Sequence, residues 1–158
     1  MAYREIRKDG DEVLRKKSRQ VDVIDTKIIT LIEDMAETMY KSDGVGLAAP
    51  QIGILKRIVT IDVGNGLFEM INPVILEQSG EQDGMEGCLS MPSTSGEVKR
   101  PMNVKAKYTD RNGEMVIIET EELFARAICH ELDHLDGILY KDKAHKMYTQ
   151  KEIEDMQK

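Results

Sequence analysis

A chain of 158 residues with 41% hydrophobic and 32% charged residues has the length and composition of one globular domain, and not those of a disordered segment. Its net charge of −7 and its sequence pI of about 5.1 disfavour a protein that binds nucleic acid through the phosphates. It has no recognisable signal or transit peptide, no apolar run near the roughly 18 residues of a membrane span, and only two cysteines, so we expect a single domain over residues 1–158 that acts in the cytoplasm and away from membranes.

The first predicted element is a surface helix. Between residues 25 and 41, apolar side chains recur at helical spacing, and Asp25 or Thr26 can cap the N-terminus. Asp43-Gly44 is expected to end this helix. The next residues, 44–53, are rich in glycine and other small residues and predict a loop in which the backbone approaches another group closely.

The middle of the chain predicts antiparallel strands. Residues 57–63 are rich in β-branched side chains and are followed by a Gly-Asn-Gly turn and by residues 67–71, which indicates a hairpin. Residues 74–76 predict a further strand. Residues 98–108 and 115–118 flank an Asn-Gly turn and predict a second hairpin.

Over residues 121–136 the apolar residues again recur at helical spacing, which predicts a second helix. Thr120 is its candidate N-cap, and Gly137 is expected to end it. This helix is apolar nearly all round, which indicates that it is buried. Residues 141–158 are charged and are expected to end in a short helix. We therefore predict an α+β fold, in which antiparallel β-sheets pack around a buried central helix, with an N-terminal surface helix and a short C-terminal helix.

The central helix carries the pattern His130-Glu131-Leu132-Asp133-His134. Residues four apart lie on one helical face, so both imidazoles can bind a single metal ion. Glu131 lies about 100° away around the helix, where a general base for a metal-activated water belongs. Burying these polar groups without a metal would cost several kcal/mol, which favours a metal site over a chance match.

A catalytic metal site needs a third protein ligand, and several residues are candidates. Position 140, where metzincins carry a third histidine, is Tyr140. Glu152 and Glu154 lie at the distance where thermolysin-like enzymes carry a carboxylate ligand, but the tail around them lacks the motif of that class, which leaves Cys88 as the favoured ligand. Cys88 lies in an acidic loop flanked by glycine, and coordination to a metal would deprotonate its thiol. Cys129 is expected to face apolar neighbours and to act as a small buried hydrophobe.

Three segments together resemble the signature motifs of the peptide deformylase family, in the order and spacing of that family. They are Gly44–Gln51, Glu86–Ser90 and His130–Gly137. The resemblance covers most of the chain and thins after about residue 140. It implies hydrolysis of the N-formyl group from the initiator methionine of newly made polypeptides, with release of formate. The family commonly has glutamine before the first histidine, where this chain has Cys129, a difference that concerns local packing.

The resemblance also implies a role for each residue of the site. The metal ligands would be Cys88, His130 and His134, with water in the fourth position. Glu131 would be the general acid and base, while Gln51 and the backbone N–H of Leu89 would stabilise the oxyanion. The donor set alone suggests zinc, whereas the family implies iron(II), with zinc, nickel or cobalt able to occupy the site.

Further expectations concern the surroundings of the metal. The methionine side chain needs an apolar slot, for which the candidate walls are Val45, Gly46, Leu89 and Ile128. Glu86 is too close to the thiolate to be a second base and should pair with a cation, for which Arg100 is the candidate. Asp133 should orient a ligand histidine or an arginine such as Arg126.

Three alternatives remain open from the sequence. One is a zincin-type metallopeptidase with Glu154 as the third ligand, and another is a non-catalytic metal-binding module. The third is a relative that removes a different small acyl group. The expected partner is an N-formylmethionyl nascent peptide. The charged tail makes the ribosome near its exit tunnel a second candidate partner, through Lys141, Lys143, Lys146 and Lys151.

Overall fold

The computed structural model describes residues 2–157, so the first and last residues of the expected domain lie outside the described part. The helices in this part are α1 (Thr26–Lys41), α2 (Glu122–Leu135) and α3 (Gln150–Met156), with short 3-10 helices η1 (Glu12–Arg15), η2 (Ala49–Ile52) and η3 (Tyr140–Asp142). The strands are β1 (Gly46–Ala48), β2 (Ile58–Ile61), β3 (Phe68–Ser79), β4 (Gln82–Cys88), β5 (Met91–Arg100), β6 (Asn103–Thr109), β7 (Met115–Glu121) and β8 (Lys146–Thr149). Of these helices, none is both long enough and apolar enough to span a membrane.

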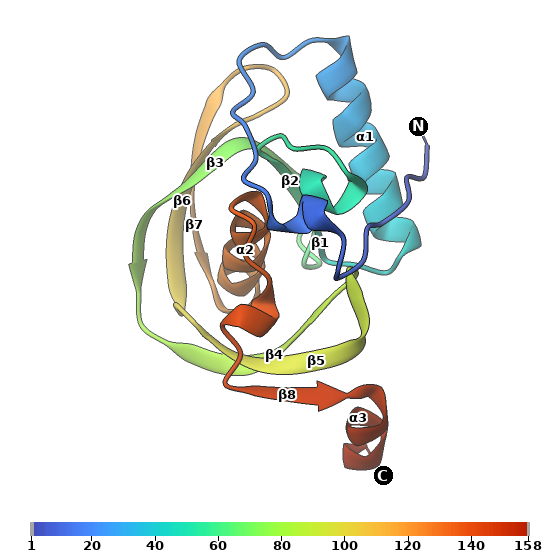
Figure 1. The fold of residues 1–158 in the computed structure, drawn as a ribbon. Helices are drawn as coiled ribbons and strands as arrows, with labels where there is room; N and C mark the ends of the chain where they lie inside the picture. The colour runs from blue at the N-terminus through green and yellow to red at the C-terminus, as the bar shows by residue number, and fades with distance from the viewer. Residues whose placement is uncertain (1, 158) are drawn as a thin grey trace.

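The described strands form two antiparallel sheets around α2, which confirms the predicted α+β architecture (Figure 1). The larger sheet has the order β1-β2-β3-β6-β7, and the smaller has the order β4-β5-β8. In Figure 1, α2 lies in the middle of the molecule between these sheets, and α1 lies to one side against β1 and β2. The fold thus places the α2 side chains opposite strands from both sheets.

The core explains why α2 is buried. Ala125, Ile128 and Leu135 are fully buried against a cluster that includes Met70 and Ala106 of the larger sheet. Burying a large aliphatic side chain contributes roughly 1.5–3 kcal/mol to the free energy of folding. The buried apolar side chains of α2 therefore stabilise its position between the sheets. The prediction that this helix is buried is confirmed.

The two long helices end close to the predicted positions. Asp25 is the N-cap of α1, since its Oδ1 accepts a hydrogen bond from the Ile28 N–H at 3.0 Å. That helix ends at Lys41, slightly before the predicted Asp43-Gly44 stop. The predicted Thr120 cap of α2 is wrong by one residue: Thr120 belongs to β7, and its hydroxyl bonds the carbonyl of Val104 at 2.9 Å.

The chain changes sheets at Pro101, where we predicted one strand over 98–108. β5 ends at Arg100 in the smaller sheet and β6 begins at Asn103 in the larger one. Proline has no N–H for a strand ladder, so the strand is readily interrupted there. The prediction of one strand was wrong, whereas the hairpin of β6 and β7 is confirmed.

Three other segments differ from the predicted elements. The expected loop over 44–53 contains β1 and η2, and β1 pairs with β2. Residues 74–76 are part of the long β3, which pairs with β2 as the first predicted hairpin. The charged tail contains β8 as well as the expected short helix α3, and β8 pairs with β5. Pairing with distant strands decided the positions of β1 and β8, because no local pattern marks either strand.

Candidate active site

The structure brings together Cys88, His130 and His134. One possible ligand atom from each lies within 4.8 Å of the others, and Cys88 Sγ is 3.3 Å from His134 Nε2. The two histidines are neighbours on one face of α2, with ring centroids 5.0 Å apart. Cys88 ends β4 after a register shift between Glu86 and Cys88, and such an irregularity re-aims a side chain.

This donor set fits a divalent transition-metal ion. A thiolate and two imidazoles are the ligands of tetrahedral catalytic sites that keep one position open. Burial lowers the pKa of His134 well below its usual value, which favours the neutral imidazole that binds metals. Its Nδ1 atom is buried and has no hydrogen-bond partner among the residues that the structure describes. A metal would bind His134 through Nε2, the atom that lies 3.3 Å from Cys88 Sγ, and would offset part of the cost of burying the ring.

Glu131 is buried beside these donors without being one of them. Its Oε1 has no hydrogen-bond partner within the described part of the chain, and burial raises its pKa to about 7, an effect that the nearby His130 opposes. A divalent cation held nearby would lower this pKa again by Coulomb attraction. Gly46 makes room for the carboxylate: a Cβ at that position would lie 2.9 Å from Glu131 Cδ. Position 46 therefore requires glycine, because a side chain there would clash with Glu131.

Gln51 is held rigidly at the same centre. Its side-chain oxygen accepts a hydrogen bond from the Ala48 N–H at 2.9 Å. Its Nε2 donates to Ser90 Oγ at 3.1 Å and to Cys88 Sγ at 3.4 Å. Sequence reasoning missed the part played by Ser90, although its position two residues after Cys88 was a usable signal. The amide donor of Gln51 consequently points at the metal-binding atoms.

A cavity of about 500 Å³ opens in front of these residues. Gly46, Leu89 and the half-exposed Val45 line it, as expected. Ile128 does not: it is fully buried in the core, and its neighbour Ala127 lines the cavity instead. Successive helical residues point about 100° apart, so the expectation for Ile128 was off by one position.

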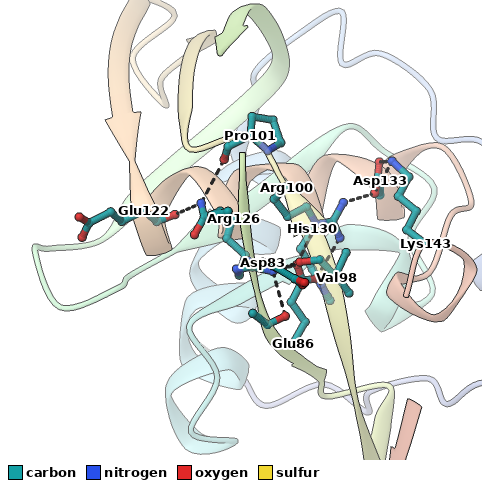
Figure 2. A network of polar contacts seen from close by, with 12 residues as sticks. Asp83, Glu86, Val98, Arg100, Pro101, Glu122, Arg126, His130, Asp133 and Lys143 are labelled. Carbon is teal, nitrogen blue, oxygen red and sulfur yellow. Dashed lines mark hydrogen bonds and ion pairs between the residues drawn. The ribbon is translucent and has the colours of Figure 1, made fainter. Parts of the chain in front are cut away.

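A buried network of charges holds the first histidine (Figure 2). Glu86 accepts hydrogen bonds from Arg100 at 2.8 and 2.9 Å, from Arg126 at 2.7 Å and from His130 Nδ1 at 2.8 Å. Burial alone would raise the pKa of Glu86, but the bonds from Arg100 and His130 outweigh it and lower the pKa to about 2. The ionised carboxylate keeps the His130 proton on Nδ1, which leaves Nε2 for a metal.

The predicted pairing of Glu86 with Arg100 is confirmed, and Asp133 bonds an arginine as predicted, but that arginine is Arg100 and not Arg126. Asp133 accepts a hydrogen bond from Arg100 Nη1 at 2.8 Å and pairs with Lys143 at 3.0 Å. Arg126 instead bonds Glu86 and the carbonyl of Val98. Helical periodicity predicts toward which side of α2 the Asp133 side chain points. Its partner Arg100 belongs to β5, and only tertiary packing places that strand beside α2.

We expect Arg100→Ala to lower the free energy of unfolding by about 3–5 kcal/mol, because it leaves Glu86 buried with fewer partners. Urea denaturation of the purified proteins measures this change. Lys99→Ala, one residue earlier on the same strand and exposed, is the control and should stay within about 0.5 kcal/mol of the parent. Equal stabilities of the two variants would contradict the importance of the network.

Comparison with known proteins agrees with this geometry. The family model described as polypeptide deformylase matches residues 3–150. The chain is 60% identical over 154 residues to the peptide deformylase of Acetivibrio thermocellus. The aligned residues cover 98% of this chain and 91% of that protein. This chain belongs to the peptide deformylase family. A second relative, peptide deformylase 1 of Clostridium acetobutylicum, is 64% identical over 143 residues, covering 90% of this chain and 95% of that protein.

A solved structure has the same fold. The crystal structure of the peptide deformylase from Thermotoga maritima matches with a TM-score of 0.89 and 46% identity, covering 92% of this chain and 99% of that one. The chain is thus a deformylase, which removes the N-formyl group from nascent polypeptides in a metal-dependent reaction at Cys88, His130 and His134.

The other candidate ligands lie elsewhere in this deformylase. Glu152 and Glu154 are exposed on α3, where Glu152 bonds Thr149 and Glu154 bonds Gln150. Cys129 is buried in the core around α2, and burial raises the pKa of its thiol to about 11. It therefore stays protonated and packs as a small hydrophobe, as predicted.

Proposed function

We propose that the deformylase acts on N-formylmethionyl peptides with Glu131 as general acid and base, and with Gln51 and the Leu89 backbone N–H stabilising the oxyanion. One observation carries this proposal: Glu131, whose Oε1 has no hydrogen-bond partner among the described residues, and Gln51 line one cavity together with the metal donors Cys88 and His130. The single domain over residues 1–158 would supply every group that the reaction needs.

When bound, the divalent ion supplies Lewis acidity, which acidifies water and polarises the formyl carbonyl. Glu131 takes a proton from the attacking water as its oxygen adds to the formyl carbon. Glu131 then delivers that proton to the nitrogen as the C–N bond breaks, which yields formate and a free amine. Gln51 Nε2 and the Leu89 N–H donate hydrogen bonds to the oxygen on which charge develops.

The methionine side chain occupies the apolar part of the cavity in this proposal. Val45, Gly46 and Leu89 form walls there, and Ala127 takes the place that sequence reasoning gave to Ile128. The absence of a side chain at Gly46 leaves room for the Glu131 carboxylate at the wall of this cavity.

We expect Gln51→Ala to lower kcat for formate release by about 10²-fold, since one preorganised donor to the oxyanion is lost. Steady-state formate release from a formyl-methionyl peptide measures this loss. Gln20→Ala, at an exposed glutamine, is the matched control and should keep the parental kcat. A Gln51→Ala enzyme that is as fast as this control would exclude the oxyanion role.

The proposed metal is iron(II), which the family resemblance supports, with zinc, nickel and cobalt as alternatives. An iron–thiolate centre is sensitive to oxygen through oxidation of Cys88. Anaerobic purification with elemental analysis, combined with formate release from a formyl-methionyl peptide, tests metal and reaction together. We expect iron, turnover that declines in air, and no acetate release from the acetyl-methionyl analogue. Stoichiometric zinc with full turnover would overturn the iron assignment.

We further propose that the enzyme acts in the cytoplasm on chains that emerge from the ribosome. The charged tail supports a contact near the exit tunnel, although Lys141 and Lys143 are engaged with Asp9 and Asp133. Co-sedimentation with ribosomes before and after deletion of the residues from 149 onward tests this contact. Unchanged co-sedimentation would remove the tail from the proposal.

A further inference from the structure

The cavity at the metal centre extends to the C-terminal helix. Gln150 and Ile153 of α3 line it, together with Thr94 and Ser95 of β5. The volume of about 500 Å³ lies in the range of roughly 300–1,000 Å³ that holds drug-sized ligands, so the cavity has room for more than one methionine side chain. The additional space lies along a wall that the mechanism above does not use.

Strand pairing fixes the position of α3. β8 pairs with β5, with Thr149 opposite Thr94 and Tyr148 opposite Ser95. The Thr149 hydroxyl accepts a hydrogen bond from the Glu152 N–H at 3.2 Å, which caps the first turn of α3. Tyr148 is buried, and its hydroxyl donates to Glu97 at 2.9 Å. The same strand β5 therefore carries one wall of the cavity and holds α3 beside it.

Ile153 differs from the rest of α3. It is the single residue of this helix that is half-buried, while the other six are exposed. Two large apolar side chains on the lining of the same cavity, Met85 and Leu123, are 43% and 51% exposed. Exposed apolar side chains on the lining suit this cavity to an apolar group of a ligand.

We propose that α3 forms the subsite for the substrate residues that follow formylmethionine, with Ile153 contacting an apolar side chain there. The inference rests on the proposed function, because it needs the methionine to lie beside the metal donors on α2. Continuity of one cavity from Glu131 to Ile153 then directs the remainder of the peptide toward α3. The acidic Glu152 and Glu154 on the same helix disfavour acidic substrate residues at this position.

The test compares two substrates on the full-length enzyme loaded with metal. The long probe is formyl-Met-Leu-Phe, and the short probe is formylmethionine methylamide, which ends before the subsite. We expect Ile153→Asp to raise KM for the long probe by about tenfold and to leave kcat for that probe unchanged. For the short probe, both KM and kcat should stay at the parental values. Ile153→Leu should behave as the parent.

Met156→Asp is the matched control, because it introduces the same charge on the same helix at a 60% exposed methionine that does not line the cavity. It should leave both probes unaffected. Equal losses of Ile153→Asp on both probes, the same loss in Met156→Asp, or an unchanged KM for the long probe would each overturn the subsite. A parental enzyme that releases no formate from the short probe would instead overturn the proposed function.

Discussion

Replacing Glu131 by alanine is expected to leave the metal bound and to lower kcat for formate release by about 10³–10⁴-fold, in the upper part of the range for general acid–base catalysis. The carboxylate is not one of the three clustered donors, so its removal leaves the metal site intact. It is, however, the buried group beside the donors whose oxygen lacks a partner in the described structure. Elemental analysis and steady-state kinetics of the same preparation measure the two effects.

Glu114→Ala removes an exposed carboxylate from a turn and is the control for this experiment. It should retain both metal and turnover. If Glu131→Ala turned over as fast as this control, the proton-transfer role would have to move to another group. If it lost its metal, Glu131 would contribute to binding the ion and the loss of rate could not be assigned to proton transfer.

Cys88→Ala is expected to weaken metal affinity by more than ~100-fold and to abolish turnover. Mutation of a residue that only hydrogen-bonds to a metal ligand typically lowers metal affinity by about 10–100-fold. Loss of a ligand itself should lower the affinity by more than that. Cys129→Ala is the matched control, since it removes the other thiol, which is buried in the core. Metal titration followed by elemental analysis of dialysed protein compares the two variants.

The same experiment distinguishes the peptidase alternative. A zincin-type site would lose its metal in Glu154→Ala and keep it in Cys88→Ala. We expect the reverse, because Glu154 is exposed on α3 while Cys88 Sγ lies 3.3 Å from His134 Nε2. Retention of stoichiometric metal by Cys88→Ala would contradict the metal site described above.

Local physics made α1 and α2 predictable. Apolar residues at helical spacing identified both helices, and the spacing of His130 and His134 placed two imidazoles on one face before any tertiary structure was known. The Asn-Gly turn likewise predicted the hairpin of β6 and β7. Each of these features depends on residues a few positions apart, so their order in the chain is sufficient.

The sequence favoured Cys88 over Glu152 and Glu154 as the third ligand because the tail lacks the thermolysin-type motif, and the resemblance to a family implied the same residue. Cys88 lies 3.3 Å from His134 after a register shift in the pairing of β4 with β5, and such tertiary placement depends on the energies of many distant contacts. For the same reason, the sequence predicted an arginine partner for Asp133 but named Arg126 in place of Arg100.

What the sequence by itself determined was the central helix, its pair of imidazoles and the adjacent carboxylate, because helical periodicity is a property of neighbouring residues. The tertiary structure alone decided that Pro101 divides β5 from β6, that Ala127 and not Ile128 lines the cavity, and that α3 borders it. These outcomes depend on how the two sheets pack around one helix. The free energy gained by burial is a sum over residues far apart in the chain, and no local sequence pattern relates those residues to one another.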